Sequence, residues 1–175
     1  MTSLRLSPAA LFCCASFAAF AQPVSDEFRR EWPDFRYLEP KQIRNLPDTV
    51  RADLENRGCR IPKFTKWDGP HNAIQGQFMK AGQQDWAVLC STAEKTVILL
   101  YPAGTTESVQ PLRSEDADPH RFIHAVTAFV LSKRALRDQQ DEQPVPEFDH
   151  DAIEDGPIGT TGKVIYFRTG EWTLL

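Results

Sequence analysis

The sequence predicts an α+β fold, a mostly antiparallel β-sheet with one or two flanking helices and one disulfide. Two apolar runs predict the sheet: Thr96–Tyr101 reads TVILLY, and Trp86–Cys90 contains no polar residue, which is typical of a strand covered on both faces. Apolar residues at every fourth position between 46 and 54 predict a helix. Cys59 and Cys90 frame the region between these elements and predict the disulfide.

Residues 1–21 have the pattern of a cleaved signal peptide. Arg5 provides the positive start, a short apolar run follows, and Ala19-Phe20-Ala21 places small residues where signal peptidase reads them. We therefore expect cleavage after Ala21 and a periplasmic or secreted protein. The alternative is lipidation at Cys13 or Cys14, which the large residue directly before Cys13 disfavours.

The charge of the chain excludes several partners. With 20 Lys and Arg against 24 Asp and Glu the net charge is −4, and removal of the leader makes it one unit more negative. A mildly acidic chain without basic clusters is not typical of a nucleic-acid-binding protein. After the leader, no apolar run approaches the roughly 20 residues of a transmembrane helix, so we expect no membrane insertion.

Cys59 and Cys90 are the two cysteines that follow the leader. A pair of cysteines in an exported chain predicts one structural disulfide. The redox-active alternative needs a C-x-x-C pair or a thiol activated by a nearby cation, and neither is evident in this part of the sequence.

Residues 22–45 are predicted to form an irregular arm, because aromatic and charged residues alternate with prolines and no period persists. A single α+β domain is predicted from residue 46 to residue 175. Its first element is a helix that contains Leu46, Val50 and Leu54, tolerates Pro47 in its first turn and stops at Gly58.

The middle of the domain is predicted to be strands. Ile61-Pro62 turns the chain outward, Ala73–Met79 alternates as a strand, and the short link from Ser91 to Lys95 predicts an antiparallel hairpin between the two apolar runs. Ser108–Arg113 is predicted as an edge strand, because Pro111 cannot donate in the middle of a sheet.

The last third of the chain is less regular. We predict a strand from Phe122 to about Val130, and then a short helix with Ser132 as N-cap that ends near Gln140. The alternative is one long helix that starts at Asp118-Pro119 and reaches Gln140. Lys163–Phe167 and Trp172–Leu175, joined by a turn that contains Gly170, predict a closing hairpin. These elements add up to a sheet of five to seven strands.

One short stretch resembles a known repeat. Gly76, Phe78, Gly82, Asp85 and the following Ala87-Val88 are similar to one FG-GAP-type repeat, the strand-turn-strand unit of integrin-like β-propellers. In that family the turn binds calcium through alternating Asp and Asn oxygens, but Gln77, Met79 and Ala81 stand at those places here. We therefore expect Asp85 to accept backbone N–H bonds inside the Gly82 turn without an ion. A complete propeller needs several blades, for which the chain is too short.

A wider resemblance rests on four segments: GCRIP, GQFMKAGQQDWAVLCS, FDHDAIED and a terminal YF-x-x-G-x-W hairpin. Together they resemble a group of small secreted bacterial proteins of uncharacterised function with a GCxIP…GQxDWAVLCS core. The resemblance implies export and a single domain from about Pro47 onward. It implies no activity.

The acidic segment from Asp149 to Asp155 is the candidate metal site. Asp149, His150, Asp151, Glu154 and Asp155 supply carboxylates at close spacing with one imidazole, which are donor types for a divalent cation. The spacing is not that of an EF-hand loop. The alternative is a solvated acidic loop whose Asp side chains cap turns before the final hairpin.

Two classes of function follow. The first is an exported non-catalytic binding domain, with an inhibitor or immunity-type role as a special case, and its partner is expected to be another envelope or extracellular protein. The second is a metal-dependent enzyme that uses the acidic loop together with a histidine from elsewhere. His71, His120 and His124 are scattered and no nucleophile elbow is recognisable, which favours binding. On this reading we expect no cofactor.

Overall fold

The computed structural model describes residues 24–138 and 146–175. The predicted leader lies outside these residues, as do the last residues of the helix predicted to end near Gln140. In the described part the helices are α1 (Asp26–Glu31), α2 (Asp48–Asn56) and α3 (Ala128–Asp138), with 3-10 turns η1 (Pro40–Gln42) and η2 (Pro102–Gly104). The strands are β1 (Phe35–Leu38), β2 (Ile61–Phe64), β3 (Ala73–Gly76), β4 (Asp85–Ser91), β5 (Lys95–Tyr101), β6 (Gln110–Asp116), β7 (Arg121–Val126), β8 (Ala152–Pro157), β9 (Lys163–Arg168) and β10 (Glu171–Leu174).

All the strand pairs of the described part are antiparallel and they form separate sheets, where the sequence had predicted a single sheet of five to seven strands. The order β3-β4-β5-β6 defines the inner sheet, and β10-β9-β8-β7 defines the outer sheet. β1 and β2 form a third, two-stranded sheet. The predicted α+β class with a mostly antiparallel sheet and one disulfide is confirmed.

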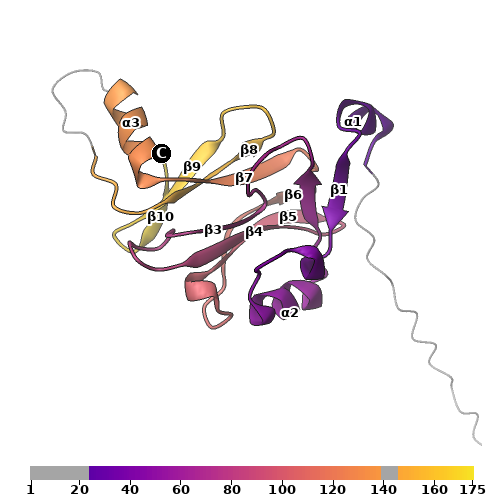
Figure 1. The fold of residues 1–175 in the computed structure, drawn as a ribbon, viewed down its shortest axis with the longest axis horizontal. Helices are drawn as coiled ribbons and strands as arrows, with labels where there is room; N and C mark the ends of the chain where they lie inside the picture. The colour runs from indigo at the N-terminus through magenta and orange to yellow at the C-terminus, as the bar shows by residue number, and fades with distance from the viewer. Residues whose placement is uncertain (1–23, 139–145) are drawn as a thin grey trace, which may run out of the picture.

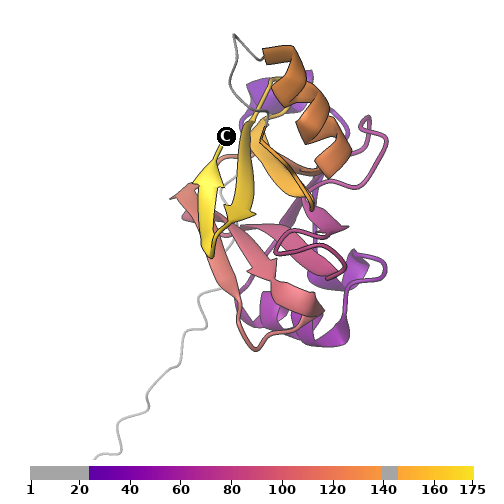
Figure 2. The same ribbon diagram turned by 90° about the vertical axis from the view of Figure 1, so that its left-hand side faces the viewer.

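The two larger sheets pack face to face between two helices. Figure 1 shows α2 below the inner sheet and α3 above the outer sheet, and Figure 2 shows the yellow strands of the outer sheet beside the magenta and pink strands of the inner one. Side chains of both sheets share one buried cluster, in which Leu89 and Ile98 of the inner sheet meet Ile123 and Ile153 of the outer sheet. The outer sheet thus covers one face of the inner sheet and α2 covers the other, as the polar-free run in β4 predicted.

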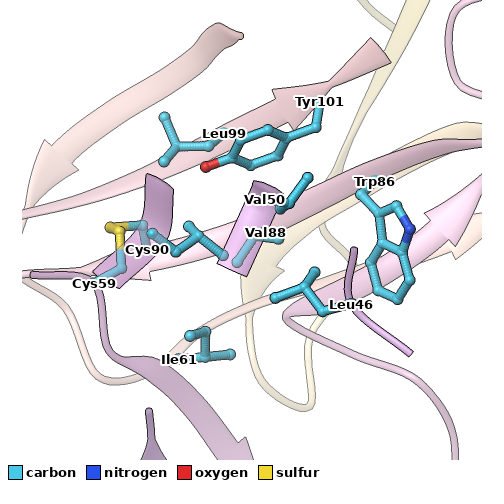
Figure 3. Close-up of a cluster of buried hydrophobic side chains, with 10 residues drawn as sticks. Leu46, Val50, Cys59, Ile61, Trp86, Val88, Cys90, Leu99 and Tyr101 are labelled. Atoms are coloured by element: carbon cyan, nitrogen blue, oxygen red, sulfur yellow. A yellow bond between two sulfur atoms is a disulfide. The ribbon is translucent and has the colours of Figure 1, made fainter. Parts of the chain in front are cut away.

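The opposite face of the inner sheet packs on α2. Val50 and Leu54 are buried in one cluster with Trp86, Val88 and Tyr101. Figure 3 shows Val50 beside the side chains of the inner sheet, with the disulfide at one side of the cluster. The helix predicted from the spacing of apolar residues is present as α2, but it begins at Asp48 with Pro47 as N-cap, so Leu46 precedes it. The Cys59–Cys90 bond joins the segment after α2 to the middle of the inner sheet, so the predicted disulfide is confirmed.

The boundary between the strand and the helix after residue 121 was predicted wrongly. The strand predicted to reach Val130 ends at Val126, and α3 begins at Ala128. Thr127 is the residue at the N-cap, where its Oγ1 accepts from Val130 N–H at 3.4 Å, whereas Ser132 lies inside the helix and donates to the carbonyl of Ala128. Phe122, Ile123 and Val126 thus lie on a strand as predicted, whereas Phe129 and Val130 lie on the helix, which packs on the outer sheet through Leu131.

The acidic segment from Asp149 to Asp155, predicted to be a loop, is partly a strand. β8 begins at Ala152 and pairs with β7 on one side and β9 on the other, so Glu154 and Asp155 lie in the middle of the outer sheet. Both are buried. The loop prediction was wrong because it weighed the charges of the segment and not the partners that neutralise them.

The chain around Pro62 was also predicted wrongly. β2 contains Pro62 and pairs with β1, and Pro62 lies opposite Tyr37 at the edge of this small sheet, where a residue without an N–H is tolerated. The segment predicted as an irregular arm thus contains α1, β1 and η1. Phe28 and Phe35 pack with Phe64 and Phe122 of the domain.

The predicted closing hairpin is confirmed. β9 and β10 are joined by Thr169 and Gly170, which both have positive φ values, 52° and 87°. Two residues of this kind form the tight turn whose twist matches a two-residue hairpin. The predicted edge strand is also present as β6, which begins two residues later than expected and continues to Asp116.

Candidate functional site

A hollow lies between α3 and the loop that joins β8 to β9 (158–162). We call it the α3 cleft. Its volume is about 770 Å³, within the range of small-molecule sites. Its lining combines apolar residues (Trp67, Leu131, Ala135, Phe148, Val164, Leu175) with polar, charged or glycine residues (Arg134, Arg137, Asp138, Glu154, Gly159, Thr160, Thr161, Gly162).

The wall of the cleft is the face of the outer sheet that points away from the inner sheet. Ile123, Ile153 and Ile165 point to the core, so their neighbours in each strand point to the opposite face. His124 and Glu154 are paired across β7 and β8, and they share this face. α3 covers one end of it through Leu131.

Glu154 is the most constrained side chain of the cleft. One carboxylate oxygen accepts from Arg134 Nη1 of α3 at 2.6 Å, and the other accepts from the Gly162 N–H at 3.0 Å. The Nε2 of His124 lies 3.6 Å from the first oxygen. Glu154 thus connects α3, the β8–β9 loop and β7, and it fixes the shape of the cleft.

His124 is half-buried beside this pair. Burial lowers the pKa of His124, and the nearby Arg134 lowers it further, while Glu154 opposes both effects. The imidazole is therefore neutral at neutral pH. Its buried Nδ1 has no hydrogen-bond partner among the described residues.

The β8–β9 loop lies so close to β8 that neither Gly156 nor Gly162 has room for a side chain. A Cβ on Gly156 would lie 2.7 Å from the Cα of Gly162, and a Cβ on Gly162 would lie 2.7 Å from the carbonyl oxygen of Asp155. Thr160 Oγ1 donates to the carbonyl of Pro157 at 2.8 Å. These contacts hold Thr160 and Thr161 at the rim of the cleft.

Trp67 also lines the cleft. It follows β2 in a turn closed by a bond from its N–H to the Phe64 carbonyl. Its ring meets Phe122 edge-on with centroids 4.8 Å apart, and 42% of the residue stays exposed. An anchored but exposed indole of this kind is a common contact surface for a ligand.

The structure does not bring the five predicted metal residues together. Asp149 accepts from His150 Nδ1 at 2.6 Å, and Asp151 accepts from the Gln77 N–H at 2.9 Å. Glu154 faces the α3 cleft, while Asp155 points to the opposite side of β8. In residues 24–138 and 146–175 no group of three or more His, Cys, Asp and Glu side chains is placed to hold a metal ion.

Asp155 belongs to a buried ionic cluster. Its carboxylate receives two bonds from the Arg121 guanidinium and a third from Arg113 Nη1 at 3.1 Å. Glu115 also accepts from both arginines, which connects β6, β7 and β8. A buried carboxylate with this many charged donors is a structural group, because removal of one partner would leave a charge without compensation.

Asp149 and His150 lie by a second, smaller hollow. Tyr166 stacks on the His150 ring with centroids 4.4 Å apart, and its hydroxyl donates to Asp149 at 3.1 Å. The hydrogen bond from His150 is the main cause that holds the pKa of Asp149 below its usual range, and the bond from Tyr166 adds to it. The hollow itself is about 390 Å³ and is also lined by Lys80.

The predicted Gly82 turn places Asp85 at its centre. Asp85 is fully buried, and its carboxylate accepts from the Met79 N–H at 2.9 Å and from the Gln83 amide at 2.6 Å. A third donor is the Ala103 N–H at 2.8 Å, which lies outside the turn. Gly82 has a φ of +81°.

Sequence reasoning missed Trp67, Arg134 and the β8–β9 loop as site residues. The run Gly159-Thr160-Thr161-Gly162 was the available signal, since glycines that flank polar residues mark a loop with a special backbone. Trp67 and Arg134 lie in separate parts of the chain, and only the packing of α3 on the outer sheet brings them to one cleft.

No described helix has the length and apolar character needed to cross a membrane. Comparison with protein-family models, with curated proteins and with solved structures finds no match.

Proposed function

We propose that this chain is an exported, non-catalytic binding protein and that the α3 cleft holds its ligand. The cleft itself is the observation that carries the proposal. It combines ligand-sized volume, an exposed indole and a few fixed polar groups, which is the usual composition of a binding site. Export is supported by the signal-peptide pattern of residues 1–21 and by the Cys59–Cys90 disulfide.

The polar groups of the cleft support binding over catalysis. Both oxygens of Glu154 are occupied by Arg134 and the Gly162 N–H, so the carboxylate serves to hold the walls together. The Thr160 hydroxyl donates to a backbone carbonyl. A nucleophile needs a base within hydrogen-bond distance, and these side chains are instead bonded to the frame of the cleft.

A specific observation favours a second candidate, a protein partner. Phe129 and Leu136 lie seven residues apart on the outer side of α3 and are 66% and 59% exposed, and Val130 beside them is 39% exposed. Exposed apolar side chains gathered on one helix are typical of protein interfaces. An inhibitor or immunity-type role would use this surface, and another envelope or extracellular protein would be the partner.

A thermal-shift panel tests the cleft proposal. Mature protein (22–175) is heated with neutral oligosaccharides, peptides, nucleotides, and Ca²⁺, Mn²⁺ or Zn²⁺. A ligand at 100 times its Kd should add about 2.7 kcal/mol to the stability. Thr161→Trp, which fills the rim of the cleft, should abolish the shift, whereas Phe129→Ala on the outer side of α3 should retain it.

Each outcome decides between the candidates. A shift that survives Thr161→Trp but is lost in Phe129→Ala would favour the protein-partner surface. A shift produced by metal alone, and lost when Asp149, Asp151 and Glu154 are changed together to Asn or Gln, would favour the metal-dependent enzyme. Export has its own test, since the mass of the protein recovered from the envelope or the culture fluid should correspond to a chain that begins at Gln22.

A further inference from the structure

We infer that the ligand of the α3 cleft is an uncharged saccharide. This inference rests on the proposed function, because it names the ligand of the same site. It follows from three features of the cleft: the balance of its charges, its aromatic rim, and the kind of polar groups at its wall.

The charges of the cleft compensate each other. Arg134 is paired with Glu154 at 2.6 Å, and Arg137 lies 3.6 Å from the carboxylate of Asp138. His124 adds no positive charge, since burial lowers its pKa. A phosphate or carboxylate ligand selects sites with surplus cations, so the balance favours a ligand without charge.

Trp67 supplies an apolar face at the rim. The edge-on contact with Phe122 holds the Trp67 ring in place, and the exposed part of the ring lines the cleft. The C–H face of a pyranose ring is a flat apolar surface that packs on an indole. A peptide side chain would be expected to enter a closed apolar pocket instead, whereas the α3 cleft is an open hollow in which charged and hydroxyl groups lie beside Leu131, Phe148 and Val164.

The polar wall suits a ligand rich in hydroxyl groups. A sugar hydroxyl both donates and accepts, so it needs donors and acceptors side by side. Arg134 uses Nη1 for Glu154, and a guanidinium has further N–H groups for a ligand. The exposed Thr161 hydroxyl adds a donor and an acceptor, and the Thr160 hydroxyl, whose proton goes to the Pro157 carbonyl, adds a further acceptor at the rim.

An oligosaccharide array followed by calorimetry tests the inference. The array carries neutral α- and β-linked glucans and chitooligosaccharides together with uronic-acid and sulfated glycans. We expect the mature wild-type protein to bind a neutral member. Trp67→Ala should raise its Kd roughly tenfold or more, as is typical for loss of a central aromatic contact, and Thr161→Val should also weaken binding.

Phe129→Ala is the matched control, because it removes another exposed aromatic residue from the far side of α3, and its Kd should equal that of the wild type. Far-UV circular dichroism and a melting curve establish that each variant is folded. Binding of charged glycans alone, no binding to any glycan, or equal losses in Trp67→Ala and Phe129→Ala would overturn the inference. If peptides or nucleotides shift the melting temperature and Thr161→Trp abolishes that shift, the saccharide is wrong while the proposed function stands. If no class of ligand acts at the cleft, both are wrong.

Discussion

Asn72 connects all three sheets through its own atoms. It is fully buried with a φ of +60°, its Oδ1 accepts from the Ile123 N–H at 2.7 Å, and its Nδ2 donates to the Pro62 carbonyl at 2.9 Å. Its backbone N–H donates to the Ile123 carbonyl, and its carbonyl accepts from Leu89. One residue thus makes bonds to β2, β4 and β7.

Asn72→Ala should therefore destabilise the protein strongly. It leaves two buried backbone groups unpaired, each costing about 1–3 kcal/mol, and it places a Cβ-bearing residue without a polar side chain at positive φ, which costs roughly 1–2 kcal/mol more. Asn45→Ala is the matched control, because Asn45 has a φ of 63° but is exposed. Urea unfolding should show only the smaller cost in Asn45→Ala. Equal losses in the two variants would show that Asn72 does not join the sheets.

Asp85 is a second buried residue whose side chain bonds several segments of the chain. Asp85→Ala removes the acceptor of the Met79 and Ala103 N–H groups and should cost about 2–6 kcal/mol, since each unpaired donor costs about 1–3 kcal/mol. Calcium should change the melting temperature of neither the wild type nor Asp85→Ala, because protein donors already satisfy the Asp85 carboxylate. A calcium-dependent rise that Asp85→Ala abolishes would instead identify an ion site like that of the FG-GAP repeat.

His71 should make stability depend on pH. Burial is the main cause that lowers the pKa of His71 to about 4, with its Nε2 accepting from the Phe64 N–H and Nδ1 bonded to Gly69 O. The unfolded state takes up a proton near pH 6.5, before the folded state does. The contribution of His71 is thus complete above pH 6.5 and is lost as the pH falls toward 4.

The measurement is the urea midpoint between pH 7 and pH 5. The wild type should lose stability over this window, and His71→Gln should lose less. His120→Gln is the control, because it makes the same change at an exposed histidine. Parallel slopes in the wild type and His71→Gln would contradict this account.

At the scale of the elements, a covalent bond holds the segment after α2 to β4. The Cys59–Cys90 bond closes a loop with a sequence separation of 31 and ties the end of α2 to β4. In the chain-entropy model a loop of this length stabilises by about 3–4 kcal/mol. Cys59→Ala with Cys90→Ala should lower the free energy of unfolding by that amount. Unfolded but unreduced wild-type protein should contain no free thiol from this pair, and two free thiols per chain would show that the bond is absent.

The elements that the sequence predicted well are those with a local signal. The periodicity of α2, the polar-free run of β4 and the Gly170 turn are each decided by neighbouring residues. β8 and the start of α3 were predicted wrongly, and the state of β8 depends on distant partners. Glu154 and Asp155 are buried in a strand only because arginines of α3, β6 and β7 neutralise them.

At the scale of the whole molecule, the site follows from the layering. The inner sheet is covered by α2 and by the outer sheet, whereas the far face of the outer sheet is covered only partly by α3. The uncovered part of that face is the wall of the α3 cleft. The acidic segment did contain one residue of the site, Glu154. The cleft itself could not be predicted from sequence, since its walls come from the turn after β2, α3, the outer sheet and the β8–β9 loop.

The most direct test of the central claim is a ¹⁵N–¹H correlation spectrum of mature protein titrated with the ligand that gives the largest thermal shift. We expect the amides of Gly159–Gly162 and Arg134, together with the indole N–H of Trp67, to move with one common Kd while the ligand remains chemically unchanged. Shifts centred on Lys80, Asp149 and His150, or on the outer side of α3, would contradict the claim that the cleft is the binding site. Conversion of the ligand during the titration would contradict the claim that the protein only binds it.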